Sequence, residues 1–129
     1  MDNIIAAIIK RNNRYLIQDH VKTNLYTLPC GKVEDNESEE DAVIREMKEE
    51  LGIKVTKLTK HFQKEDFGIV VNGKSYDTIT NYFIIDSYEG IIMNKEPHKH
   101  RALLWLTKKE IDKLPKTEIL KHFMEYGGI

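Results

Sequence analysis

The sequence predicts an α+β fold in which a mixed sheet is covered by helices on two faces. Strand-like runs lie on both sides of one highly charged helical segment, and two further helical segments follow near the end of the chain. The 129 residues have 40% hydrophobic content, enough for one sizeable core, and contain no repeats or low-complexity tracts. Residues 1–129 are therefore predicted to form a single domain.

The predicted strands fall into two groups. Before the charged helical segment, an apolar run, a polar turn and a second run predict a β-hairpin, at residues 4–9, 11–13 and 14–18. After it, strand-like runs cover residues 53–62, 69–71, 78–85 and 102–106. The pair Asn72-Gly73 predicts a second hairpin, because asparagine and glycine tolerate the left-handed backbone of tight hairpin turns.

Local signals bound the charged helical segment. Asn36, Glu37 and Ser38 supply capping groups and negative charge, both of which stabilise the start of a helix. Gly52 follows its end, where glycine adopts the left-handed conformation with little strain. The sequence therefore predicts a helix between these two signals.

Two short helices are predicted near the C-terminal end. Thr107 and Glu110 have the spacing of a capping box, which predicts a helix that ends before Pro115. Proline cannot continue a helix, because it has no backbone N–H to donate. An amphipathic pattern then predicts a last helix over residues 117–126, ahead of a Gly-Gly pair.

The central helix has one charged and one apolar face. At about 100° per residue, the charged face contains Arg45, Glu46, Glu49 and Glu50, and the apolar face contains Val43, Ile44, Met47 and Leu51. The glutamates lie within about 6 Å of one another and repel, and an ordinary solvated face would have lysine at i+4 from Glu46. A divalent cation with oxygen ligands, such as Mg²⁺, would offset this repulsion, so a metal site is predicted here.

Charge is unevenly distributed along the chain. Residues 34–50 contain nine acidic and two basic side chains, whereas the net charge of the whole chain is −1. This distribution favours a cation site that receives an anionic substrate guided by lysines elsewhere. It disfavours a nucleic-acid surface, which would show a basic stripe with interleaved aromatic residues.

Other features limit location and partners. A single cysteine, Cys30, excludes an internal disulfide framework. The apolar run at the N-terminus is too short for a signal or membrane segment, so a cytoplasmic location without a membrane partner is expected. The sequence leaves open whether the protein is a monomer or a homodimer.

The spacing of the charged residues resembles that of a known family. The pattern Gly-x5-Glu-x7-Arg-Glu-U-x-Glu-Glu-x-Gly-U, with U aliphatic, is the Nudix box of the Nudix hydrolases. Its seven fixed positions are filled by Gly31, Glu37, Arg45, Glu46, Glu49, Glu50 and Gly52, and its aliphatic positions by Met47 and Ile53. The resemblance implies the Nudix fold, an α/β/α sandwich with a mixed sheet, and a MutT-like activity with Mg²⁺, or Mn²⁺ as the alternative, as cofactor.

The same resemblance implies roles for individual residues. Glu46, Glu49 and Glu50 would be metal ligands, with Glu46 alternatively the general base on the attacking water. Arg45 would orient a neighbouring glutamate by two hydrogen bonds. Glu37 would stabilise the loop before the helix by pairing with Arg45 or with loop amides.

Two implied ligands lie outside the helix. The backbone carbonyl of Cys30 is one, although cysteine would be strained there if the position required a positive φ. The other is Glu96, in a Glu-Pro-x-Lys segment that resembles nucleoside triphosphate diphosphatases of the family, with Glu89 as the second candidate. His98 and His100 have the spacing of a transition-metal pair, but no third nitrogen or sulfur ligand lies nearby in sequence.

The implied reaction is hydrolysis of a phosphoanhydride in a (deoxy)nucleoside triphosphate, giving a nucleoside monophosphate and pyrophosphate, with damaged nucleotides among the possible substrates. One alternative is a nucleotide sugar, a dinucleoside polyphosphate or ADP-ribose. The other is a non-catalytic nucleotide-sensing module, which the intact box disfavours. Substrate-binding residues stay undefined, with Tyr26, Tyr82 and Phe83 as candidates for base stacking by location alone.

Overall fold

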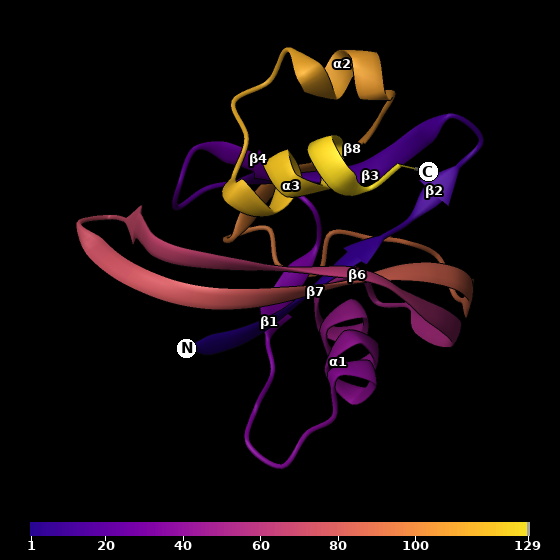
Figure 1. Ribbon diagram of the computed structural model, residues 1–129. Helices are drawn as coiled ribbons and strands as arrows, with labels where there is room; N and C mark the ends of the chain where they lie inside the picture. The colour runs from indigo at the N-terminus through magenta and orange to yellow at the C-terminus, as the bar shows by residue number, and fades with distance from the viewer. Residues whose placement is uncertain (129) are drawn as a thin grey trace.

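The computed structural model describes residues 1–128, which contain three helices and two four-stranded sheets (Figure 1). The helices are α1 (Glu39–Leu51), α2 (Lys108–Asp112) and α3 (Glu118–Tyr126). The strands are β1 (Asp2–Ile8), β2 (Lys10–Arg11), β3 (Arg14–His20), β4 (Leu25–Thr27), β5 (Cys30–Lys32), β6 (Lys54–Val71), β7 (Lys74–Glu89) and β8 (His100–Leu106). No helix of this described part combines the length and the apolar composition that crossing a membrane requires.

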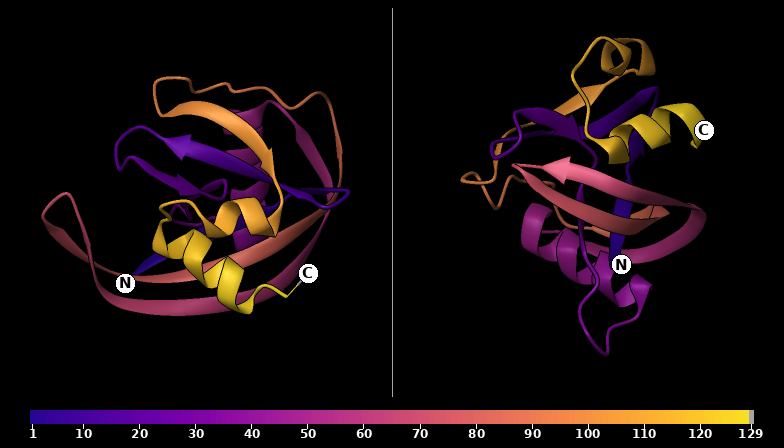
Figure 2. Two further views of the ribbon diagram at one scale, coloured as in Figure 1. Left: turned by 90° about the horizontal axis from the view of Figure 1, so that it is seen from above. Right: turned by 60° about the vertical axis from the view of Figure 1, so that its left-hand side comes forward.

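The first sheet is mixed and has the strand order β5-β1-β7-β6. Its strands β1 and β7 are parallel, whereas β1–β5 and β6–β7 are antiparallel. Residues 5–8 of β1 are fully buried, which is typical of a strand covered on both faces. Helix α1 covers one face, and the second sheet with α2 and α3 lies on the other (Figures 1 and 2).

The predicted hairpin between residues 4–9 and 14–18 is confirmed only next to its turn, where β2 pairs with β3 and the Leu16 amide donates to the Ile9 carbonyl at 3.0 Å. The pairing predicted for residues 4–8 is wrong. Strand β3 pairs with β2, β4 and β8 in the second sheet, and not with β1. Both hydrogen-bonding edges of β1 are occupied, because β5 and β7 pair with it on either side. The chain therefore leaves the first sheet after β1 and enters the second at β2.

The runs predicted at residues 53–62, 69–71 and 78–85 belong to one long hairpin formed by β6 and β7. Its predicted turn is confirmed, since Asn72 and Gly73 have φ values of 51° and 80°. Register shifts interrupt the pairing at four places, which explains why the sequence pattern breaks into shorter runs. Figure 2 shows the tip of this hairpin projecting beyond the rest of the sheet.

The core has two parts, one on each side of the first sheet. Residues on α1, alternate residues of β1 and the inner face of β7 form one part, which includes Ile5, Ala7, Val43, Met47, Leu51 and Phe83. The other part joins the two sheets to α2 and α3 and includes Ala6, Ile8, Tyr82, Ile111, Leu120 and Phe123. The α+β fold with helices on both sides of a mixed sheet is thus confirmed, although the strands form two sheets.

The helix ends follow the sequence signals. The Ser38 side chain accepts a hydrogen bond from the Asp41 amide at 3.0 Å, and Gly52 ends α1 with a φ of 70°. Thr107 and Glu110 form the predicted capping box of α2. One residue departs from the predicted apolar face of α1, because Ile44 is 37% exposed.

Candidate functional site

Arg45 forms hydrogen bonds with several carboxylate groups next to the pocket that is described below. Its Nε and Nη2 atoms donate to the two carboxylate oxygens of Glu37, at 2.7 and 3.0 Å. Its Nη1 atom donates to Glu46 at 2.7 Å and to Glu49 at 3.3 Å. One guanidinium group therefore fixes the directions of three carboxylates from two parts of the chain.

Glu37 closes the loop that precedes α1. Besides the fork from Arg45, its Oε1 atom accepts a hydrogen bond from the Glu34 amide at 3.0 Å. The hydrogen bonds from Arg45 and from this amide lower the pKa of Glu37 to about 2. The carboxylate therefore stays ionised at neutral and mildly acidic pH.

Gly31 is required by close packing and not by its backbone angles. A Cβ atom at this position would lie within 2.6 Å of the Cγ and Oε1 atoms of Glu46. Its φ is not among the positive values of the described residues. The absence of a side chain on β5 thus lets the Glu46 carboxylate lie directly against the strand.

Cys30 carries no backbone strain, contrary to the concern raised by its sequence position. Among the described residues, the non-glycine positions with positive φ are Asn12, Asn24, Asn36 and Asn72. Its enclosed Sγ atom and the nearby Glu50 carboxyl raise the pKa of the Cys30 thiol to about 12. The side chain is therefore a neutral thiol in the metal-free protein.

Glu50 is buried although it lies on the charged face of α1. The residue is 2% exposed, and its Oε1 atom accepts a hydrogen bond from Nε2 of Gln18 at 2.9 Å. Its Oε2 atom is buried and has no hydrogen-bond partner among the described residues. Burial and the neighbouring Glu46 raise the pKa of Glu50 to about 9. A buried carboxyl group without a counterion beside further carboxylates is a place that a divalent cation fits.

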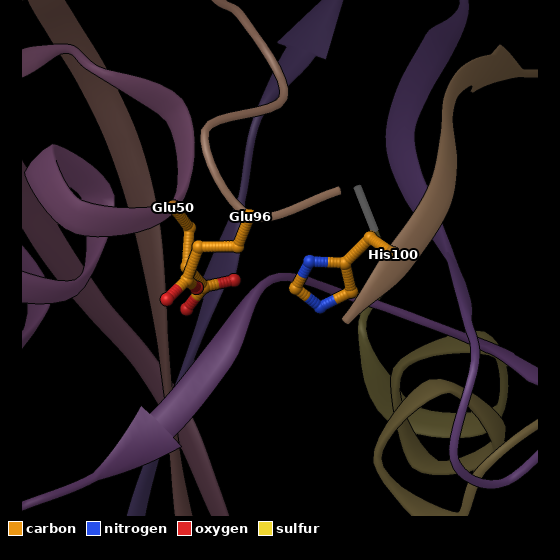
Figure 3. A group of neighbouring side chains, drawn as sticks. All are labelled: Glu50, Glu96 and His100. Atoms are coloured by element: carbon orange, nitrogen blue, oxygen red, sulfur yellow. The ribbon is translucent and has the colours of Figure 1, made fainter. Parts of the chain in front are cut away.

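The side chains of Glu96, in the loop before β8, and of His100, the first residue of β8, lie close to the Glu50 carboxyl group. The amide groups of Lys99 and His100 donate to the Glu96 carbonyl at 2.9 and 3.1 Å, which closes one tight turn. This turn directs the side chains of Glu96 and His100 towards Glu50, as Figure 3 shows. One ligand atom from each of the three residues lies within 4.8 Å of the other two. Glu89, the second candidate, ends β7 opposite Lys54 and is exposed.

These residues surround a pocket of about 520 Å³. Its lining residues come from β3–β5, α1 and the loop before β8, and they are His20, Val21, Lys22, Thr27, Cys30, Gly31, Lys32, Glu46, Glu50, Glu96, His98, Lys99 and His100. Its three lysines are exposed and form its rim. Two of them are paired with carboxylates, Lys32 with Asp2 at 3.1 Å and Lys99 with Glu96 at 3.2 Å, whereas Lys22 is the third. Glu49 is outside this lining, and its side chain is 53% exposed.

Sequence reasoning grouped five residues as metal ligands, and four of them, Glu46, Glu50, Glu96 and Cys30, line this pocket, whereas Glu49 does not. It missed Gln18, for which the available signal was a single amide at the end of an apolar run in β3. Two of the three residues named for base stacking were wrong, because Tyr82 and Phe83 are core residues that are 0% and 2% exposed.

The α+β fold and a pocket lined by carboxylates and lysines are features of enzymes that act on phosphate groups, and the family comparison shows that class. The family model of the NUDIX domain matches residues 1–126. The chain therefore belongs to the Nudix family and is a Nudix hydrolase.

Relatives that match most of the chain agree with this assignment. The CTP pyrophosphohydrolase of Escherichia coli (strain K12) is 28% identical over 121 residues, which are 89% of this chain and 82% of the relative. The putative 8-oxo-dGTP diphosphatase 2 of Mycobacterium tuberculosis (strain ATCC 25618 / H37Rv) is 31% identical over 114 residues, 84% of this chain and 74% of the relative. The crystal structure of the MutT NUDIX hydrolase from Burkholderia pseudomallei matches with a TM-score of 0.84 and 26% identity, and covers 96% of this chain and 95% of that one.

Proposed function

We propose that the protein is a divalent-metal-dependent nucleoside triphosphate pyrophosphohydrolase, which releases a nucleoside monophosphate and pyrophosphate. The observation that supports this proposal best is the pocket itself, where three carboxyl groups and three exposed lysines line a space of about 520 Å³. Such a lining offers oxygen ligands to a cation and positive charge to phosphate oxygens. The names of the curated relatives, which denote enzymes acting on CTP and 8-oxo-dGTP, point to the same substrate class.

The residues present fit a divalent cation. Glu50 offers a buried oxygen without a partner, and Glu46 and Glu96 border the same pocket. Glu49 and the backbone carbonyl of Cys30 are the further ligands that we propose. Mg²⁺ or Mn²⁺ at this place would neutralise charge on the phosphate oxygens and favour ionisation of the attacking water.

The side chains around the cation position have separate tasks in this proposal. Arg45 holds Glu46 by a 2.7 Å hydrogen bond, so that Glu46 is directed to accept a proton from the attacking water. Lys22, Lys32 and Lys99 bind the triphosphate at the rim. Positioning and charge, more than covalent chemistry, are what the protein contributes to hydrolysis of a phosphoanhydride.

The nucleoside end of the substrate has a place beside this pocket. A second cavity of about 320 Å³ lies between the long hairpin and the start of α3, and its walls include Ile4, Ile69, Val71, Tyr76, Thr80 and Thr117. The Thr117 hydroxyl donates to the Thr27 hydroxyl at 3.1 Å, and Thr27 lines the first pocket. This hydrogen bond links one wall residue of each space, and the mainly apolar surface of the second cavity suits a nucleobase.

The test is hydrolysis of a panel of nucleotides with Mg²⁺, followed by separation of the products. The panel contains CTP, 8-oxo-dGTP, the common nucleoside triphosphates, a nucleotide sugar, a dinucleoside polyphosphate and ADP-ribose. We expect a triphosphate to give equal amounts of monophosphate and pyrophosphate, and Glu50→Gln to abolish this release. Glu40→Gln, an exposed change in the first turn of α1, is the matched control and should leave the rate unchanged. Release of single phosphate, or preference for a non-triphosphate substrate, would overturn the proposal.

Two predictions about partners remain, one on nucleic acid and one on the oligomeric state. Hydrolysis without added nucleic acid is expected, because the sequence has no basic stripe with interleaved aromatic residues. The oligomeric state, monomer or homodimer, stays a prediction that sedimentation of the purified protein would decide.

A further inference from the structure

His100 lies in the inner wall of the carboxylate pocket and is 5% exposed. Its Nδ1 atom is buried and has no hydrogen-bond partner among the residues that the structure describes. A buried polar atom without a partner destabilises a folded protein by about 1–3 kcal/mol. Such an atom at the wall of a pocket is therefore expected to meet a ligand there.

The backbone fixes the position of this imidazole ring. His100 is the first residue of β8 and pairs with His20 of β3, so strand pairing holds its Cα atom. Its carbonyl accepts a hydrogen bond from the Asn94 side chain at 2.7 Å, and its amide donates to the Glu96 carbonyl at 3.1 Å. The backbone of His100 is thus held by strand pairing on one side and by the closed turn on the other, which limits where the imidazole ring can lie.

The ring faces two carboxylates that belong to other segments. Glu50 comes from the last turn of α1 and Glu96 from the start of the closed turn, and Figure 3 shows both carboxylates on the same side of the His100 ring. One ligand atom of each residue lies within 4.8 Å of the other two. Ligands about 2.1 Å from one small divalent cation can span such a distance after a small side-chain adjustment. A neutral imidazole has one ring nitrogen with a free lone pair, which can bind a cation.

We propose that a ring nitrogen of His100 is a ligand of the cation held between Glu50 and Glu96, and that this nitrogen makes the site bind Mn²⁺ more tightly than Mg²⁺. This inference rests on the cation site of the proposed function and adds to it both a ligand and an order of preference. Mg²⁺ binds oxygen ligands almost exclusively, whereas transition-metal ions accept imidazole nitrogen readily. An imidazole beside two carboxylates therefore discriminates between the two ions.

The competing explanation is that His100 only packs against His20. The two rings are 5.6 Å apart between centroids with an interplanar angle of 51°. That arrangement accounts for the burial of the His100 ring but leaves its Nδ1 atom without a partner among the described residues. The two explanations differ in whether nitrogen contacts a bound ion, which spectroscopy measures directly.

The experiment is pulsed electron paramagnetic resonance of Mn²⁺ bound to the protein without nucleotide, which detects nitrogen-14 coupled to the ion. We expect nitrogen coupling in the wild-type protein and in His98→Gln, and no coupling in His100→Gln. His98 is the matched control, because it lines the same pocket but is exposed. In titrations of the same proteins, His100→Gln should weaken Mn²⁺ binding at least about tenfold and Mg²⁺ binding much less.

Bound Mn²⁺ without nitrogen coupling in the wild-type protein would overturn the inference, whatever the variants do. Coupling that persists in a folded His100→Gln variant would overturn it as well. Thermal unfolding monitors folding of the variants, and His100→Asn provides a second replacement. Neither of these results would affect the proposed function, which fails separately if the wild-type protein binds neither ion and hydrolyses no triphosphate.

Discussion

Arg45 is the residue at which most contacts of the carboxylate cluster meet. It binds Glu37 through two nitrogens and Glu46 through the third, all at 3.0 Å or less. A lysine at this position would have the same charge but not the planar fork that serves several carboxylate oxygens together. The direction of the Glu46 carboxylate therefore depends on the shape of the guanidinium group as well as on its charge.

Arg45→Lys is expected to lower kcat about 10- to 100-fold, because Glu46 loses its fixed orientation. Steady-state hydrolysis of the preferred triphosphate at saturating Mg²⁺ measures this effect. Lys48→Gln, an exposed change on the same helix, is the matched control and should keep the wild-type rate. Equal rates for Arg45→Lys and the wild type would contradict a positioning role for Arg45.

Glu50 makes the stability of the metal-free protein depend on pH. Its pKa is about 9 in the folded protein, against an ordinary value of 4.5. Below pH 4.5 the group is protonated in both the folded and the unfolded chain. Between pH 4.5 and 9 the unfolded chain ionises and the folded chain does not, so the free energy of unfolding falls as pH rises.

The prediction is that Glu50→Gln flattens this pH dependence when a chelator is present. The slope that the carboxyl contributes is at most about 1.4 kcal/mol per pH unit, and relaxation of the pocket reduces it. Urea unfolding at pH 5, 7 and 9 measures the free energies of both proteins. If the wild type and the variant lose stability in parallel over this range, Glu50 does not have a raised pKa.

The burial of Glu50 shows how far sequence reasoning reaches at the level of one residue. Helical periodicity places Glu50 on the charged face of α1, which is correct as an angle around the helix axis. It contains no information about Gln18, which comes from β3 and covers the carboxyl group. Residues that meet across the fold become visible only when the strands are placed.

At the level of elements, the contact between β5 and α1 determines how closely the Glu46 carboxylate approaches the strand. The Glu46 side chain lies against Gly31, where a Cβ atom would overlap it. The adjacent Cys30 contributes a neutral thiol that the proposed mechanism does not use. Neighbouring positions on one short strand therefore have opposite tolerance to substitution.

Gly31→Ala should lower kcat by up to about 100-fold, because it displaces the Glu46 carboxylate from its place beside the strand. Cys30→Ala should keep the rate within a few-fold of the wild type, since its backbone carbonyl is retained. Kinetics at saturating substrate, together with thermal unfolding of both variants, provides the comparison. A larger loss for Cys30→Ala than for Gly31→Ala would show that the thiol has a role.

Helix starts, which depend on local signals, agree with their predictions. Strand pairing between distant segments was not predicted. The starts of α1, α2 and α3 follow from Ser38, Thr107 and Thr117, each of which accepts a hydrogen bond from an amide three residues later. The parallel pairing of β1 with β7 joins segments about 75 residues apart in sequence, and no local pattern indicates it. The incorrect part of the N-terminal hairpin, the pairing of residues 4–8, has the same origin, because adjacent runs were assumed to pair along their whole length.

The capping box of α2 allows a prediction for one element. Thr107→Ala should lower the free energy of unfolding by about 1 kcal/mol, because the Glu110 amide loses its acceptor. Thr107→Ser retains the hydroxyl and is the matched control. Urea unfolding measures both, and a neutral effect of Thr107→Ala would mean that water replaces the cap without loss.

Across the whole molecule, positive and negative charge are separated although they nearly cancel. The net charge is −1, yet nine acidic groups lie within residues 34–50. The fold directs Glu46 and Glu50 into the pocket and places lysines from β3–β5 and from the loop before β8 at its rim. The sequence predicted both the acidic segment and an approach guided by lysines, but it did not identify which lysines, because they come from separate elements.

Lys22 is the rim lysine best suited to test this arrangement, because it is exposed and contributes to neither the carboxylate wall nor a strand. Lys22→Gln should lower kcat/KM about 3- to 10-fold at low salt through a higher KM, since the triphosphate loses one favourable charge contact. The loss should shrink as ionic strength rises, because exposed charges are screened beyond about 10 Å at 0.1 M salt. Lys22→Arg should recover the wild-type value, and Lys48→Gln, which removes the same charge away from the pocket, should change little. A loss that is independent of salt would mean that Lys22 acts through packing and not through charge.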